Sequence, residues 1–270
     1  MIDQWLFSII YFCCYTIYIP FFHSLAPFIT PCHATNSTCL RLSSQHALPI
    51  VAAGIPSLGM NSLDPMAMRQ VKAVQAGLKM EFKNTIVRGL RNCKVLELRY
   101  IKNSNLIHKT EIDLKCSVTL IGNYSLNGKL LVLPIEGEGK YKIKIRKWIL
   151  RCRNNNLIKT KGSILSFLIL EDVIVKVALD IEELTSDGER YWKVNGFKQT
   201  ANVVGRVQFN FQNLFNGNRH LSDPVHEFAN TNWKDIFQEV APPIVNTIVS
   251  QIVDETIKFF DKVPIGQLVL

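Results

Sequence analysis

The chain has 270 residues, of which 47% are hydrophobic, so it can bury the core of one large domain or two small ones. No Pro- or Ser-rich linker divides it, and we expect a single domain over residues 27–270. The formal net charge of +9 is typical of nucleic-acid-binding proteins, but removing the six positive charges of residues 146–169 lowers it to +3, which argues against a nucleic-acid partner.

Residues 5–22 form an unbroken run of apolar and small residues without a charge. The run lacks a preceding Lys or Arg and is longer than the roughly 7–15 residues of an ordinary signal peptide. Pro20 and the lack of a flanking basic cluster count against the alternative, an uncleaved membrane anchor. We expect residues 1–26 to be a signal peptide that is cleaved between Ser24 and Pro27, and the protein to be secreted.

Cleavage would remove two cysteines and leave an odd number, namely Cys32, Cys39, Cys93, Cys116 and Cys152. Cys32 and Cys39 flank a short polar loop and are the best candidates for a disulfide. No C-x-x-C pattern or matching His spacing is present, so we expect no metal site. Two sequons would make Asn36 and Asn123 glycosylation candidates in the secretory pathway.

The middle of the chain is dominated by period-two alternation, which predicts strands with one buried face. Before it, a helix is predicted between Pro65 and Lys83. The apolar positions of the predicted strands are Leu96, Leu98 and Tyr100; Ile112, Leu114, Cys116, Val118 and Leu120; Tyr141, Ile143 and Ile145; Val173, Val175, Val177, Leu179 and Ile181; and Val207, Phe209 and Phe211. Asn127-Gly128 predicts a hairpin turn into a strand over residues 130–135, and Ser186-Asp187-Gly188 predicts another turn.

A long apolar helix is predicted at the C-terminal end. Asp223 followed by Pro224 suits an N-cap and first helical position, and apolar residues recur at helical spacing from Trp233 to Phe260. A continuous helix from Pro224 would be roughly 55 Å long, and Pro242-Pro243 should kink it. One-faced antiparallel strands beside such a helix predict an α+β fold in which a strongly curved sheet wraps the helix. Such a roll leaves gaps that become dry, apolar pockets.

Several short motifs occur in a characteristic order along the chain. They are Gly54-Ile55-Pro56-Ser57-Leu58-Gly59 with Leu63-Asp64-Pro65, Gly89-Leu90, Gly122-x-Tyr124-x-x-x-Gly128, residues 130–135 with Gly137-x-Gly139, Asn213-Leu214-Phe215-Asn216-Gly217, Asn230-Thr231-Asn232-Trp233, and Val263-Pro264. Over about residues 31–265 the chain resembles the insect takeout and haemolymph juvenile-hormone-binding protein family. The resemblance implies a super-roll of the tubular lipid-binding class, points to the same Cys32–Cys39 disulfide, and implies a circulating or chemosensory carrier.

The chain departs from this resemblance at residues 146–169. In the family, Gly137-x-Gly139 and the strand after it should run almost directly into Leu170-Glu171-Asp172. The intervening segment is basic and contains Cys152, the unpaired fifth cysteine. It could be a membrane-surface patch, a tolerated loop insertion, or intronic sequence translated in frame. We favour the last interpretation and expect membrane contact to be transient at most.

Catalytic signatures are missing from the sequence. Gly54-Ile55-Pro56-Ser57-Leu58-Gly59 has the wrong spacing for a nucleophile elbow, Gly137-Glu138-Gly139-Lys140 lacks the Ser or Thr of a phosphate loop, and His226-Glu227 has no second His at metalloprotease spacing. We therefore expect no enzyme and no cofactor.

As the resemblance implies, the expected function is a secreted, monomeric carrier of juvenile hormone, another terpenoid or a fatty-acid-like lipophile. Biological rhythms are associated with some members of the family. The candidates for the cavity wall are apolar residues that we expect to face the inside of the roll. They are Ile55, Leu58, Leu63, Phe82, Leu98, Val118, Leu131, Phe209, Phe211, Phe215, Trp233, Phe237, Val240 and Ile244. Tyr100 and Tyr141 are candidate polar contacts. The alternatives are an extracellular interaction module without a ligand, and a mispredicted family member that does not fold.

Overall fold

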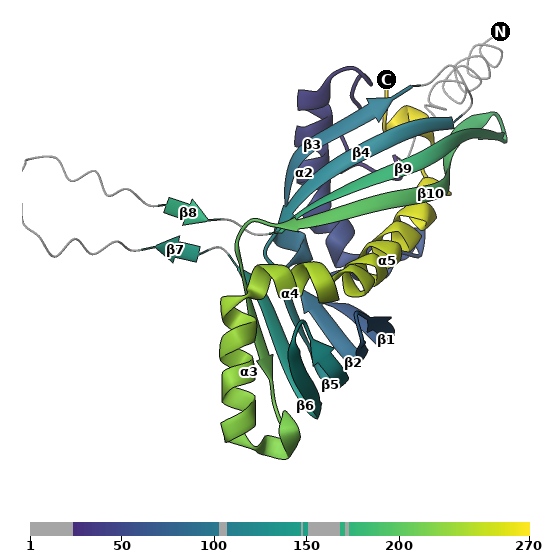
Figure 1. Ribbon diagram of the computed structural model, residues 1–270. Helices are drawn as coiled ribbons and strands as arrows, with labels where there is room; N and C mark the ends of the chain where they lie inside the picture. The colour runs from purple at the N-terminus through teal and green to yellow at the C-terminus, as the bar shows by residue number, and fades with distance from the viewer. Residues whose placement is uncertain (1–23, 103–106, 147, 151–167, 171–172) are drawn as a thin grey trace, which may run out of the picture.

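The computed structural model describes residues 24–102, 107–146, 148–150, 168–170 and 173–270 (Figure 1). The predicted signal peptide lies almost wholly outside these residues, as does most of the basic segment. The flanks of that segment, β7 (Trp148–Leu150) and β8 (Leu168–Leu170), pair with each other as antiparallel strands that extend away from the body of the molecule.

Two curved antiparallel sheets form the framework, and neither closes into a barrel. The larger sheet has the order β1 (Met66–Gln75), β2 (Leu78–Arg88), β5 (Thr119–Leu130), β6 (Leu133–Arg146) and β11 (Arg206–Phe211). The smaller has the order β10 (Glu189–Val203), β9 (Val173–Ser186), β4 (Ile107–Cys116) and β3 (Lys94–Ile101). The predicted alternation is confirmed in β6, β9 and β11, where Ile143, Ile181 and Val207 are buried.

The predicted helix between Pro65 and Lys83 is wrong, because this region is the β1–β2 hairpin. Met66 and Met68 on β1 and Met80 and Phe82 on β2 are buried at every second position, which is strand spacing. Ala76 and Gly77 between the strands both have positive φ, 47° and 82°, as a tight hairpin turn requires.

The predicted turn at Asn127-Gly128 is also wrong. Strand β5 continues to Leu130, and the chain reverses at Leu131 and Val132. Gly128 serves a different purpose, since a Cβ on it would lie 2.2 Å from the carbonyl oxygen of Gly77 in the neighbouring hairpin. The glycine therefore allows strand β5 to approach the turn between β1 and β2 closely.

The predicted strand over residues 112–120 divides into two. Strand β4 ends at Cys116, and β5 begins at Thr119 in the other sheet, so this segment crosses from one sheet to the other. Leu96 does not face the core as predicted and is 42% exposed, because the register of β3 shifts between Val95 and Glu97.

The C-terminal helical region consists of three helices rather than one. They are α3 (Arg219–Thr231), α4 (Trp233–Val240) and α5 (Pro242–Phe260). Helix α3 begins earlier than predicted, because Asn218 rather than Asp223 is its N-cap, and Pro224 lies inside the helix. The break predicted at Pro242-Pro243 is confirmed, and Pro242 begins α5.

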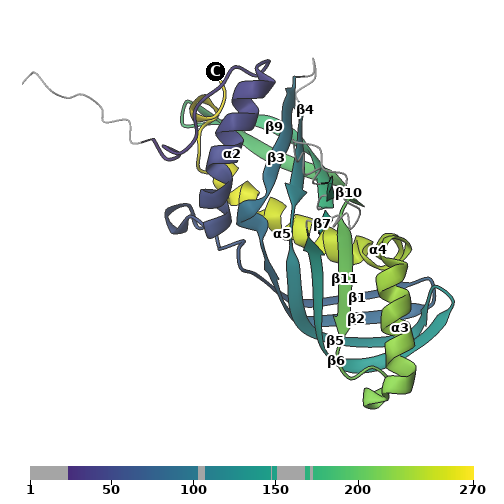
Figure 2. The same cartoon turned by 90° about the vertical axis from the view of Figure 1, so that its left-hand side faces the viewer.

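Helix α2 (Ser37–Ala53), which was not predicted from the sequence, lies over β3 (Figure 2). Helix α5 passes between the two sheets, next to β1 of one and β10 of the other. The buried residues form two clusters that meet at α5, where Val245 packs against both. The curved sheets therefore enclose a central helix, as the α+β prediction stated.

The described residues contain two disulfides. Cys32–Cys39, the predicted pair, joins the N-terminal segment to α2, and Cys93–Cys116 joins the start of β3 to the end of β4. Just before the first disulfide, Ala26 is buried and Leu25 N–H donates to Gln267 Oε1 at 2.9 Å. The segment at the predicted cleavage site thus packs against the C-terminal end of the chain.

Candidate functional site

A cavity of about 390 Å³ lies between α2, the two sheets and α5. Helix α2 covers it on one side, β3, β4, β9 and β10 line it on another, and α4 and α5 border it. The inner ends of β2, β5, β6 and β11 complete the wall. Its apolar lining includes Leu48, Val51, Leu63, Leu98, Ile112, Leu114, Val118, Ile143, Val175, Phe209, Phe237, Ile244, Val245, Ile248, Val249 and Ile252.

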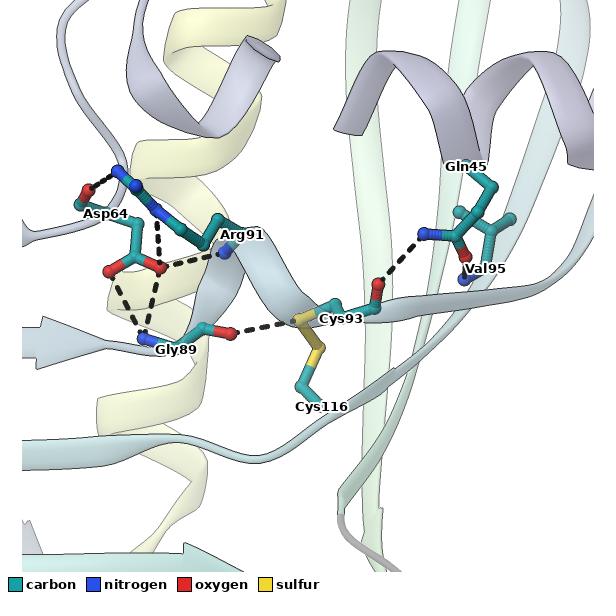
Figure 3. Close-up of a disulfide and its surroundings, with 7 residues drawn as sticks. All are labelled: Gln45, Asp64, Gly89, Arg91, Cys93, Val95 and Cys116. Carbon is teal, nitrogen blue, oxygen red and sulfur yellow. Dashed lines mark hydrogen bonds and ion pairs between the residues drawn. A yellow bond between two sulfur atoms is a disulfide. The ribbon is translucent and has the colours of Figure 1, made fainter. Parts of the chain in front are cut away.

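Helix α2 is fixed over the cavity by the side chain of Gln45, next to a disulfide in the cavity wall (Figure 3). Gln45 Nε2 donates to Cys93 O at 3.2 Å, and its Oε1 accepts from Val95 N–H at 2.8 Å. These bonds satisfy backbone groups of β3, the edge strand of its sheet. Cys93 and Cys116 are themselves on the cavity wall, so their disulfide fixes the wall directly below the helix.

Asp64, within a predicted family motif, holds the neighbouring junction between the sheets (Figure 3). It is 6% exposed, and its carboxylate accepts from Gly89 N–H at 3.2 Å and Arg91 N–H at 2.9 Å. Arg91 also donates through Nη2 to Asp64 O at 2.7 Å. Because Gly89 and Arg91 link β2 to β3, this carboxylate fixes the point where the chain passes from one sheet to the other.

The loop between the two halves of the same motif attaches to α5. Gly54 has φ of 87°, and a Cβ there would lie 2.8 Å from the Asn61 carbonyl carbon. Asn61 donates from its backbone N–H and its side-chain amide to Glu255, at 2.7 and 2.9 Å. Burial would raise the pKa of Glu255, but hydrogen bonds from Lys258 and Asn61 outweigh it and lower that pKa below its ordinary value.

Two further family motifs dock against each other at the far end of the larger sheet. Leu214 is buried and bridges to Gly137, and Tyr124 Oη donates to Gln212 O at 2.7 Å. Gly139 has no room for a side chain, since a Cβ would lie 2.4 Å from Gln212 O. These motifs are structural and do not line the cavity.

The cavity wall carries a polar group at the end formed by the smaller sheet. Tyr100 Oη donates to Glu183 Oε1 at 3.3 Å, and Glu183 also pairs with Arg190 at 3.0 Å and lies 3.6 Å from His108 Nε2. Burial, reinforced by the Glu183 carboxylate, raises the pKa of Tyr100 to about 12 against the opposing influence of the Trp192 N–H and Arg190. The Tyr100 hydroxyl is therefore neutral at physiological pH.

The structure brings together some of the predicted wall residues and separates others. Those on the wall are Leu63, Leu98, Val118, Phe209, Phe237, Val240 and Ile244, with Tyr100. Those elsewhere are Ile55, Leu58, Phe82, Leu131, Phe211, Phe215 and Trp233. Ile55 and Leu58 pack in the cluster near the C-terminus, whereas Phe82 and Phe211 pack with Tyr141 in the larger sheet.

Tyr141, the second predicted polar contact, is not on the wall. Its hydroxyl lies 2.7 Å from Thr85 Oγ1, and burial raises the pKa of Tyr141 to about 12 although the Thr85 hydrogen bond opposes this.

Sequence reasoning missed the wall residues of α2, such as Leu48 and Val51, and Trp192 on β10. The alternation of β9 was recognised and could have placed Val175 on the wall.

The described part of the chain has no cluster of three or more potential metal ligands. Among its helices, none is long and apolar enough to cross a membrane. Asn36 and Asn123, the glycosylation candidates, are both exposed; Asn36 also serves as the N-cap of α2. Their modification stays a prediction.

Comparisons with known proteins agree with this architecture. A family model for haemolymph juvenile hormone binding protein (JHBP) matches residues 8–155 and 153–270. The circadian clock-controlled protein daywake of Drosophila melanogaster is 23% identical over 229 residues, which cover 79% of this chain and 76% of daywake. The juvenile hormone-binding protein of Manduca sexta is 25% identical over 103 residues, or 37% of this chain and 45% of that protein.

The crystal structure of takeout 1 from Epiphyas postvittana shows the same fold. It superposes with a TM-score of 0.76 at 24% sequence identity and covers 89% of this chain and 99% of takeout 1. The two segments matched by the family model overlap at residues 153–155, within the basic segment that interrupts the resemblance. Because the matched family consists of binding proteins, the chain is not an enzyme. The chain belongs to the haemolymph juvenile hormone binding protein family.

Proposed function

We propose that this protein is a secreted, monomeric carrier that encloses one small lipophile, such as a juvenile hormone, another terpenoid or a fatty-acid-like molecule. The observation that carries the proposal is the cavity of about 390 Å³ between α2, α5 and the two sheets. Its volume falls within the range of about 300–1,000 Å³ typical of small-molecule sites. It is more than twice the roughly 150 Å³ of an apolar cavity that holds benzene, so a longer or polycyclic ligand is expected.

The chemistry of the wall favours an apolar ligand. The wall contains no Lys, Arg, His, Asp or Glu among the described residues. Burial of about 300 Å² of ligand surface at about 25 cal/mol per Å² contributes roughly 7 kcal/mol before the cost of association. A micromolar dissociation constant requires about 8 kcal/mol after that cost, so a larger buried surface or a polar contact must add to this burial.

Secretion is supported by the pattern of cysteines. Cys32–Cys39 and Cys93–Cys116 are disulfides, which persist in oxidising compartments and are rare in the cytosol. The apolar run over residues 5–22 is consistent with entry into the secretory pathway.

Filling the cavity tests the proposal. Ala47 on α2 is 6% exposed and lines the cavity, whereas Ala53 on the same helix is exposed and does not line it. Ala47→Phe should displace ligand volume and weaken binding of the fluorescent lipophile N-phenyl-1-naphthylamine at least about tenfold, because the ring occupies the space the ligand needs. Ala53→Phe is the matched control and should bind like the unmodified protein.

Circular dichroism and thermal unfolding establish that both variants fold. Equal binding by the two variants would show that the reporter sits elsewhere. If the unmodified protein fails to bind the reporter or other lipophiles, the interaction-module alternative becomes the better account.

A further inference from the structure

We propose that Thr110 and Trp192 form a polar anchor that hydrogen-bonds a neutral oxygen atom of the ligand, so that the protein selects esters, ketones or ethers over hydrocarbons and carboxylic acids. This inference rests on the proposed carrier function and adds a ligand class to it. It is carried by two buried polar atoms on the cavity wall, Thr110 Oγ1 and Trp192 Nε1, that have no hydrogen-bond partner in the protein.

The other polar side chains of the wall are satisfied without a ligand. Ser43 Oγ donates to Thr30 O at 2.8 Å, Tyr100 Oη donates to Glu183, and Thr256 Oγ1 donates to Ile252 O at 2.9 Å. Thr30 and Ser44 are not buried, so water can reach them. The only other buried side-chain atom without a partner among the described residues is Gln199 Oε1, and Gln199 is not on the wall.

Thr110 and Trp192 both lie next to Tyr100. Thr110 is the direct cross-strand partner of Tyr100 in the β3–β4 ladder, so the two side chains share a face of the sheet. The Trp192 ring stacks on Tyr100, with ring centroids 5.6 Å apart and an interplanar angle of 27°. The two free polar atoms therefore flank one residue at the same end of the cavity.

The orientation of the indole is fixed from its other side. Trp192 is 7% exposed, and its ring meets Phe260 edge-on with centroids 5.2 Å apart. Its N–H lies near the Tyr100 hydroxyl but outside hydrogen-bond geometry, while that hydroxyl donates to Glu183. A buried indole N–H without a partner is uncommon in folded proteins, so an acceptor from a ligand would complete the site.

The chemistry of the two groups defines the ligand atom. An indole N–H can only donate, and a threonine hydroxyl can donate to the same oxygen. A carboxylate is a poor candidate, because burial of a charge requires a partner and the wall supplies no cationic side chain among the described residues. A hydrocarbon would leave both donors unsatisfied. A neutral carbonyl or ether oxygen at the end of an apolar chain fits both restrictions.

The experiment compares matched ligands and isosteric variants. Methyl tetradecanoate, tetradecanoic acid and pentadecane compete at pH 7 with N-phenyl-1-naphthylamine for the full-length secreted protein. The variants are Thr110→Val and Trp192→Phe, which remove a donor and keep most of the shape. Thr247→Val on α5 is the control, since its hydroxyl donates to Pro243 O at 2.9 Å and Thr247 does not line the cavity.

The unmodified protein should bind the ester more tightly than the acid or the alkane. Thr110→Val and Trp192→Phe should each weaken ester binding about threefold to tenfold and change alkane binding less than about twofold, because only the hydrogen bond is lost. Thr247→Val should change neither.

An equal loss of ester and alkane binding in the variants, or no loss at all, would overturn the anchor and leave the carrier function intact. Tighter binding of the acid than of the ester would overturn the neutral-acceptor assignment. Failure of the unmodified protein to bind any of the three ligands would refute the carrier function itself. Thermal unfolding checks each variant, and Thr110→Val alone decides the question if Trp192→Phe does not fold.

Discussion

Close packing around individual glycines explains the residue pattern of two of the family motifs. Gly137 and Gly139 on β6 lie against the segment that contains Leu214, and a Cβ on Gly137 would approach Leu214 Cα to 2.9 Å. The side chain of Asn213 reinforces this contact by donating to Glu138 O at 3.0 Å. Both motifs are therefore parts of one structural junction, and their distance from the cavity explains why Phe215 is not on its wall.

Gly139→Ala should destabilise the protein by about 1–3 kcal/mol, because the added methyl group would overlap the carbonyl oxygen of Gln212. Gly196→Ala is the matched control, since no atom lies within 4 Å of the position that its methyl group would take. The control should change the free energy of unfolding by less than about 0.5 kcal/mol. Urea unfolding of both variants measures the difference, and equal stability would refute the close contact.

At the scale of elements, strand alternation and helical spacing located much of the structure. The alternation in β6, β9 and β11 is clear because one face of each strand is buried, and the same patterns put Leu98 and Phe209 on the cavity wall. The apolar spacing after Trp233 runs through α4 and α5, and Ile244 of α5 lines the cavity.

Other elements could not be predicted because their sequences are ambiguous. Helix α2 contains Pro49 and a run of polar residues at its start, so its wall-forming side chains were not recognised. The methionines of β1 and β2 are compatible with helix or strand, and only their packing in the sheet decides between the two. The free donors of Thr110 and Trp192 depend on neighbours from β3 and α5, which no local pattern reveals.

The contact between Asn61 and α5 makes an element-scale prediction about pH. Because the folded-state pKa of Glu255 is lowered, its ionisation stabilises the fold above its unfolded pKa of about 4.5, and this contribution is lost as pH falls through the folded value. Glu255→Gln should therefore be less stable than the unmodified protein at pH 7, and the difference should shrink as the pH falls below about 4.5. Urea unfolding between pH 7 and pH 3 measures this, and a difference independent of pH would contradict it.

At the scale of the whole molecule, the cavity lies where the two sheets and two buried clusters meet. The clusters join at α5, and both Val245 and Val249 of this helix line the cavity. The Cys93–Cys116 disulfide in the wall and the Gln45 and Asp64 hydrogen bonds beside it fix the surrounding elements and so hold the cavity in shape. A preformed apolar cavity of this kind binds ligand without the cost of reorganising the fold.

The most direct test is native mass spectrometry of the protein secreted from insect cells, followed by solvent extraction of the same sample. We predict a mass increment of one neutral lipophile per chain that disappears on denaturation, with an oxygen-containing, largely apolar molecule in the extract. A folded protein that carries no such increment and takes up none of the lipophiles added to it would contradict the account.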